Sequence, residues 1–422
     1  MATRSWRGRS LPIRPTRRGW AIAASIVAAF AAGAVFDRRE GFIVGIFLLT
    51  LLAVSAVVVA VRRAGLDVTR RPRADSLSAG EASDVVLDVR TGTWDPAITR
   101  WRDVIPASFG DPPSGDADTL ASASVGGVVR ATYRIRPTRR GEFALGPLVV
   151  TLEDPFGLIE AERASNGRTE VVVTPRVVRL VRSELIQASG EGARHEHRMS
   201  SHPRVDELIA REYRAGDPMR RIHWRATARR GELMVRQEEQ EVDPAVVLVL
   251  DTAAAPGDAA TSAEAFEQRV EMTASIAVHV LAAGFRLTLV ESVPRDTDAA
   301  RRFEPSQSAE ALRRLAVVAP VRSDDDTPDI AAICRDLLDR AGAPVPLIAV
   351  LGDSGAAAAR RLGPLGRRAD PAIAFLPPSD AARSVLRSAG WVTGVLDPGQ
   401  DIAETWIDTV LLDTAAASGG TR

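Results

Sequence analysis

Two uninterrupted apolar segments lie near the start of the chain, at residues 19–36 and 41–61, and neither contains a charged side chain. About 20 apolar residues in a helix, each rising 1.5 Å, cross a hydrocarbon core of roughly 30 Å. The second segment reaches this length. The first is shorter, so a signal peptide is the alternative for it. Because only residues 37–40 separate the two, the pattern favours a hairpin of two transmembrane helices.

Arginines flank the apolar segments and predict their orientation. Six precede the first span and five follow the second, whereas the connection has two arginines balanced by two acids. Basic residues near short spans stay on the cytoplasmic side. We therefore expect a multi-pass protein of the plasma membrane, with the N-terminus and the large C-terminal region cytoplasmic. Residues 1–65 form this predicted tail and hairpin.

The pattern changes to short runs of period 2 over residues 66–180. Clear runs occupy residues 85–89, 131–135, 148–152 and 170–173, separated by clusters of Gly, Pro, Asp and Ser. Short alternating strands with polar turns are typical of a small antiparallel β-sandwich. No catalytic group of residues is evident there, so we expect a structural or partner-contacting module.

Strand-length apolar runs alternate with helical periodicity over residues 242–413. The strands are expected at residues 245–251, 285–290, 346–351, 372–376 and 391–396, with helices between them. Such alternation predicts an α/β domain with a mostly parallel, doubly wound sheet. Residues 414–422 are expected to be a disordered tail.

Composition narrows the class of protein. The 422 residues include 54 basic and 54 acidic side chains, and every basic one is arginine; hydrophobic residues make up 45%. These values exclude global disorder and a small disulfide-stapled scaffold. Cys334 is the single cysteine, which fits a reducing compartment and offers no cysteine-based zinc site.

A connector at residues 181–241 contains the most distinctive segment, residues 211–231. Gly216 suits a turn, Asp217 an N-cap, Pro218 a first helical position and Gly231 a residue just beyond the helix. We therefore expect a helix of about three turns, followed by a strand at residues 232–236.

Charge is segregated within this connector. Residues 211–230 contain seven arginines, and residues 232–243 contain five acids. Nucleic-acid binding is one interpretation of the arginines. The other interpretation is that the basic and acidic stretches form two complementary surfaces inside the fold. We favour this second interpretation because the segment lacks several aromatic residues on which bases could stack. We therefore expect no nucleic acid as a partner.

The segment also resembles the signature of a bacterial family called domain of unknown function 58. The resemblance implies two membrane helices, a β-rich module and a C-terminal von Willebrand factor A-like domain. It further implies association with MoxR-type AAA+ ATPases and other membrane proteins, in the assembly or maturation of protein complexes. The matching residues are Arg211, Tyr213, Gly216, Asp217, Arg220 or Arg221 (we favour Arg221), Ile222, Trp224, Ala228 and Arg229.

In a von Willebrand factor A-like domain, Asp251 and Asp353 end the strands where a metal site would draw carboxylates. The usual Asp-x-Ser-x-Ser pattern has two hydroxyls that complete an oxygen shell for Mg²⁺. Here both serine positions, Ala253 and Ala255, are alanine. We expect a degenerate site that binds no metal tightly, with weak Mg²⁺ binding through Asp251, Thr252 and Asp353 as the alternative.

Common enzyme signatures are missing, including the nucleophile elbow, the phosphate-binding loop and the zinc-protease motif. The leading hypothesis is thus a non-enzymatic, membrane-anchored scaffold or adaptor without a cofactor. One alternative is a metal-dependent receptor domain that binds a ligand through Mg²⁺ at Asp251. Another is a hydrolase that uses the connector, with Asp217 and His223 as its best candidates.

Overall fold

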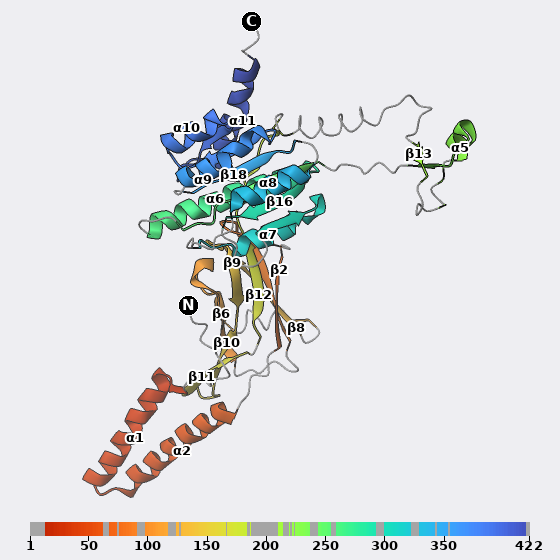
Figure 1. Cartoon of the computed structure of the whole chain (residues 1–422). Coiled ribbons are helices and arrows are strands. Elements are labelled where there is room, and N and C mark those ends of the chain that lie inside the picture. The colour runs from red at the N-terminus through yellow and green to blue at the C-terminus, as the bar shows by residue number, and fades with distance from the viewer. Residues whose placement is uncertain are drawn as a thin grey trace. The chain divides into compact units, whose positions relative to one another are not determined.

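The computed structural model separates the chain into two compact units, Met1–Thr174 and Pro175–Arg422. Figure 1 shows the helices and strands of both units. The structure describes residues 13–61, 67–73, 76–90, 98–116, 124–125, 128–165, 167–183, 186, 210–213, 219, 222, 224–236, 244–254, 259–292, 299–321, 329–341, 344–352 and 355–418.

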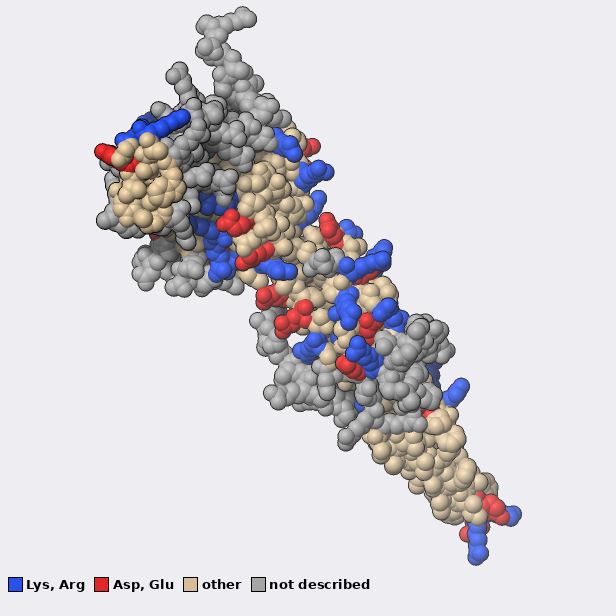
Figure 2. Space-filling view, turned by 90° about the vertical axis from the view of Figure 1, so that its right-hand side faces the viewer, with Lys and Arg blue, Asp and Glu red and all other residues tan. Residues whose placement is uncertain are grey.

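Two long helices open the first unit, α1 (Arg17–Val35) and α2 (Arg39–Val61). Both are long and apolar enough to cross a membrane, at about 28 and 34 Å from the rise per residue. They pack side by side as the predicted hairpin. Figure 2 shows their uncharged surface, with charged side chains at the tip of the hairpin. Both predicted helices are therefore confirmed, each beginning two residues earlier than expected.

The rest of the first unit is built from three sheets, and the predicted antiparallel strands are confirmed. The sheet orders are β1-β11-β10-β5-β6, β2-β4-β8-β7 and β3-β12-β9. Among the described strands of this unit, only the β3–β12 pair is parallel. The strands are β1 (Arg14–Pro15), β2 (Asp67–Pro72), β3 (Leu77–Ser78), β4 (Ser83–Arg90), β5 (Ile98–Asp103), β6 (Ser114–Asp116), β7 (Ser124–Val125), β8 (Val128–Ile135), β9 (Gly141–Leu145), β10 (Leu148–Glu153), β11 (Ile159–Ala164) and β12 (Thr169–Thr174). Alternate residues of these strands form one apolar core that includes Leu87, Val150 and Leu152.

A buried ion pair joins two of these sheets. Arg70 on β2 donates to both carboxylate oxygens of Asp103 on β5, at 2.8 and 2.6 Å, and both side chains are fully buried. Tyr133 on β8 donates its hydroxyl to Asp103 at 2.7 Å. Burial, together with the charge of Asp103, raises the pKa of Tyr133 far above its usual range. The two charge-assisted hydrogen bonds of this pair therefore hold the two sheets together.

The second unit contains a six-stranded sheet in the order β17-β16-β15-β18-β19-β20. All neighbouring pairs are parallel except β16–β17. The strands are β15 (Ala245–Leu250), β16 (Arg286–Glu291), β17 (Ala300–Phe303), β18 (Leu347–Val350), β19 (Ala372–Leu376) and β20 (Val392–Val395). The predicted mostly parallel α/β sheet is confirmed.

Helices cover both faces of this sheet, because the strands bury side chains in both directions. Val246 and Leu248 of β15 pack with α6, α7 and α11 in one core, whereas Val247 and Val249 pack with α8, α9 and α10 in the other. The helices are α6 (Ala259–Ala282), α7 (Ser308–Val317), α8 (Ile330–Arg340), α9 (Gly355–Leu362), α10 (Asp380–Ser388) and α11 (Ile402–Ser418). Strands buried on both faces account for the continuous apolar runs in the sequence.

Two details differ from the sequence-based expectations. The antiparallel edge strand β17 lies in a segment where no strand was expected. Helix α11 continues to Ser418, so the segment expected to be disordered from residue 414 is helical in its first part. The run Ala415–Ala417 explains this difference, because alanine is the strongest helix former.

Candidate functional site

Asp251 follows the last residue of β15, at the carboxyl end of the central part of the sheet. From β15 the chain passes through α6 to β16 on one side, and β18 later pairs with β15 on the other side. The strand order therefore reverses beside Asp251. In open α/β sheets this switch point is the place where ligands and catalytic groups usually lie.

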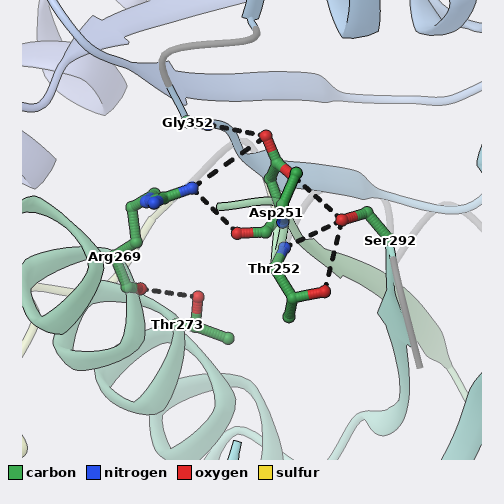
Figure 3. Close-up of polar contacts among 7 residues, drawn as sticks. Asp251, Thr252, Arg269, Thr273, Ser292 and Gly352 are labelled. Atoms are coloured by element: carbon green, nitrogen blue, oxygen red, sulfur yellow. Dashed lines mark hydrogen bonds and ion pairs between the residues drawn. The ribbon is translucent and has the colours of Figure 1, made fainter. Parts of the chain in front are cut away.

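The Asp251 carboxylate is buried and accepts hydrogen bonds from three segments of the chain (Figure 3). One carboxylate oxygen, Oδ1, accepts from the Ser292 hydroxyl at 2.8 Å and from the Ala253 backbone N–H at 3.0 Å. The other, Oδ2, accepts from the Gly352 N–H at 3.0 Å. Ser292 follows β16 and Gly352 follows β18, so Asp251 holds together the ends of three neighbouring strands.

A buried guanidinium lies against the same carboxylate. Arg269 on α6 is 3% exposed, and its Nη1 atom donates to the Asp251 backbone carbonyl at 2.9 Å and lies 4.0 Å from Oδ2. The guanidinium carbon also lies 5.2 Å from the centre of the Phe266 ring, a favourable distance for a cation above an aromatic face. The positively charged guanidinium of Arg269 thus lies directly beside the Asp251 carboxylate.

Gly352 makes room for this cation. A Cβ atom added at Gly352 would lie 2.0 Å from Nη1 of Arg269 and 3.1 Å from Oδ2 of Asp251. Any larger residue would have to displace the guanidinium from the carboxylate. The Arg269–Asp251 contact therefore requires glycine at position 352.

The predicted metal-ligating residues fall into two groups. Asp251 and Thr252 lie at the site, where the Thr252 hydroxyl is 3.3 Å from the Ser292 hydroxyl and the Thr252 N–H donates to it at 2.8 Å. Asp353 lies outside the described residues. Within the described part of the chain, no group of three or more His, Cys, Asp or Glu side chains is placed to hold a metal ion.

Sequence reasoning missed three members of the site. Arg269 could have been noticed as a charged residue among the apolar positions of its helix, next to Phe266 and Val270. Ser292 and Gly352 follow strand-length apolar runs, so the carboxyl ends of those strands were the signal. No spacing rule, however, indicates that these residues meet at Asp251.

The family-signature segment is described only in part. Strands β13 (Ala210–Glu212) and β14 (Met234–Arg236) pair antiparallel, which places Arg211 opposite Val235, and α5 (Trp224–Arg230) lies between them in sequence. The helix is shorter than the three predicted turns. Gly231 has a φ of 76°, as expected for a residue just beyond a helix. Gly216, Asp217, Arg220, Arg221 and His223 lie outside the described residues.

The described signature residues divide into buried and exposed ones. Ile222 and Met234 are both buried, and the backbone N–H of Tyr213 donates to the Leu233 carbonyl at 2.8 Å. Trp224 is 67% exposed, and Ala228 and Arg229 are also exposed. The segment therefore contains residues that pack and residues that face outward.

Cys334 is a fully buried residue of α8, on the opposite face of the sheet from α6. Burial, together with the charge of Asp329, raises the pKa of its thiol to about 12. Because the thiolate is the reactive form, Cys334 is not placed to act as a nucleophile.

No curated protein matches this chain. Among solved structures, Cwp6 from Clostridium difficile is 10% identical; the match covers 82% of this chain and 56% of that one, with a TM-score of 0.14. A structure described as a beta-galactosidase from Bacteroides fragilis is 11% identical, with coverages of 74% and 39% and a TM-score of 0.15. The chain thus spans about half the length of the first structure. TM-scores this low support no conclusion about the fold of the present chain.

The signature residues and much of the α/β unit, including β15, α6 and β18, fall within one family match. Residues 209–370 match the model of the family described as "Protein of unknown function DUF58".

Proposed function

We propose that this protein is a non-enzymatic scaffold, anchored in the plasma membrane by α1 and α2, that presents a von Willebrand factor A-like domain to the cytoplasm. Its partner is a MoxR-type AAA+ ATPase, and together they act in the assembly or maturation of protein complexes. The apolar hairpin and the family match over residues 209–370 support this proposal. The chemistry of the Asp251 site supports it further.

The observation that carries the proposal is the Arg269–Asp251 contact at the switch point of the sheet. A carboxylate at such a place usually serves a metal or a substrate. Here three protein donors and a buried guanidinium surround it. A carboxylate engaged in this way is a structural support. The described residues that it holds, which are 251–254, Ser292 and Gly352, then form part of a metal-independent docking face.

The backbone around the site is rigidly held, as a docking face requires. The Val321 N–H donates to the Thr252 carbonyl at 2.9 Å, and the Ala254 N–H donates to the Val321 carbonyl at 2.8 Å. Beside it, Arg314 of α7 donates to both carboxylate oxygens of Glu291 at 2.6 and 2.8 Å. A partner that contacts residues 251–254 or Val321 therefore meets backbone that is already hydrogen-bonded, which lowers the entropic cost of binding.

Co-purification of the full-length protein in detergent tests the proposal. We expect a MoxR-type ATPase from the same cell to be recovered with it, equally well in Mg²⁺-free buffer when the nucleotide is held constant. Ala254→Arg adds charge to the exposed loop after β15, and Ala283→Arg adds the same charge to an exposed turn before β16, at the opposite edge of the sheet. If the ATPase is lost with Ala254→Arg but is still recovered with Ala283→Arg, the result supports the docking face. Recovery of no such ATPase under any nucleotide contradicts the partnership.

One observation favours the metal-dependent receptor as a second candidate. The hydroxyls of Thr252 and Ser292 lie beside the Asp251 carboxylate and form a small oxygen-rich group. Calorimetry with Mg²⁺ separates the two candidates. The scaffold predicts no binding to the wild-type protein, whereas a receptor predicts binding that Asp251→Ala removes.

A further inference from the structure

The loop Asp154–Leu158, which joins β10 to β11, lies where the hairpin meets the β-sheets. The backbone N–H of Thr16, directly before α1, donates to the Leu158 carbonyl at 2.9 Å, and the Thr16 hydroxyl donates to the Gly157 carbonyl at 2.6 Å. A Cβ atom added at Gly19 would lie 2.1 Å from the Leu158 carbonyl oxygen. The first turn of α1 therefore packs directly on this loop.

The second helix packs against the same region. Val59 of α2 forms an apolar cluster with Leu158, Ile159 and Ala161, and Val59 is completely buried. Arg163 of β11 donates to the Val59 carbonyl at 3.2 Å, which places a cation at the negative end of the helix. Both helices thus meet the β-sheets at the level of the Asp154–Leu158 loop.

The loop itself is held in one conformation by Asp154. The Asp154 carboxylate accepts from the backbone N–H groups of Ile159, Leu158 and Phe156 at 2.6, 2.7 and 2.9 Å. Burial pushes the pKa of Asp154 upward, but these hydrogen bonds outweigh it and leave the pKa below its ordinary value. The loop is therefore a preformed structure at pH 7.

Phe156 is the exposed apolar residue of this ordered loop, with 55% of its surface accessible. Close to it, α1 begins with Arg17 and Arg18, and Trp20 in the first turn is 66% exposed. Tryptophan and arginine at the start of a membrane helix are typical of the level of the lipid headgroups. An aromatic side chain held at that level gains free energy by entering the interface.

Resting on the membrane anchor proposed above, we propose that the Asp154–Leu158 loop is a third membrane contact, with Phe156 inserted among the lipid headgroups. The occupant of this surface is the bilayer that holds α1 and α2. The contact would fix the β-sheets against the membrane surface as well as against the two helices.

Site-directed labelling of the full-length chain in lipid nanodiscs tests this contact. In a Cys334→Ala background, single cysteines replace Pro155 beside Phe156, Val27 in the middle of α1, or Val104. Val104 is an exposed apolar residue at the other end of β10, where its N–H donates to the Pro147 carbonyl. Each cysteine carries a polarity-sensitive dye, and the lipids carry a nitroxide quencher near the headgroup or deep in the acyl chain.

We expect strong quenching at position 27 by the deep quencher, quenching at position 155 by the shallow one, and none at position 104. Adding Phe156→Asp to the Pro155→Cys protein should abolish its quenching, while Val104→Asp should leave it unchanged. Thermal melting of the variants, compared with that of the parent protein, checks that the β-sheets remain folded.

Quenching at position 27 but not at position 155 would overturn the third contact and leave the membrane anchor intact. Quenching at position 155 that survives Phe156→Asp would overturn the role of Phe156. No quenching at position 27 would overturn the anchor itself, and the third contact with it.

Discussion

Removing the guanidinium of Arg269 is the most direct test of the interpretation of the α/β site. The change Arg269→Ala leaves the Asp251 carboxylate buried beside an empty space. Both side chains are about 5% exposed or less, and 4.0 Å separates Nη1 from Oδ2. Breaking a buried pair by removing one partner costs about 3–5 kcal/mol of folding free energy. We expect the α/β unit of Arg269→Ala to lose stability of this order.

The exposed pair Arg340–Asp336 supplies a matched control on the same unit. Their side chains are 69% and 55% exposed, and they form an i,i+4 pair on α8. Such a pair contributes only about 0.3–0.5 kcal/mol. Arg340→Ala should therefore change the stability very little.

The same variant should also acquire a response to divalent cations. The oxygens of Asp251, Thr252 and Ser292 remain, and the space left by Arg269 would admit Mg²⁺. A cation present at 100 times its Kd stabilises the folded state by about 2.7 kcal/mol. We expect Mg²⁺ to restore part of the stability of Arg269→Ala and to leave the wild-type protein unchanged.

Hydrogen exchange measured by mass spectrometry is the suitable assay, because it reports the opening free energy of β15 and α6 separately from the first unit. Peptides from β10 serve as an internal reference. A structural role for Arg269 is refuted if Arg269→Ala exchanges no faster than Arg340→Ala. It is also refuted if Mg²⁺ protects the wild-type site as strongly as the variant.

Three further predictions concern other groups that are buried or half-buried. Arg70→Met should destabilise the first unit by about 3–5 kcal/mol in chemical denaturation, because it leaves Asp103 buried without its partner, whereas Arg134→Met, at an exposed pair, should cost no more than about 1 kcal/mol. Burial and the charge of Arg182 lower the pKa of His279, which contacts Trp406 of α11. The folded state therefore favours the neutral ring, and protection of α11 from hydrogen exchange should fall as the pH drops below about 6.5; His279→Gln should remove this dependence. Cys334 should resist a thiol reagent at pH 8 and react only on unfolding, and rapid labelling of the native protein would contradict its burial.

Much of the fold could be predicted because its strands are buried on both faces or alternate strictly. The run Ala245–Leu250 and the two apolar helices are visible in the sequence for this reason. Strand β17 was missed because it is an edge strand whose sequence, Ala300–Phe303, contains two arginines. The docking of the hairpin on β11 was also missed, because it depends on backbone contacts between residues about 140 positions apart.

The site was predicted only in part. Asp251 was found because it ends a recognisable strand, and the expectation of a degenerate metal site followed from Ala253 and Ala255. The identity of its partners could not be predicted, because Arg269, Ser292 and Gly352 reach Asp251 only through the order of the strands. A charged residue in a helix is usually a surface residue, and only the tertiary structure shows that Arg269 is 3% exposed.

The pairing of β1 with β11 has a mechanical consequence. The chain enters the hairpin from a strand of the sheet, and the end of α2 is bonded to the same sheet through Arg163. With the hairpin in a bilayer, a force that pulls on the β-sheets would be carried by hydrogen bonds at both ends of the hairpin. A lateral force on the β-sheets would then reach the membrane with little stretching between the sheets and the helices.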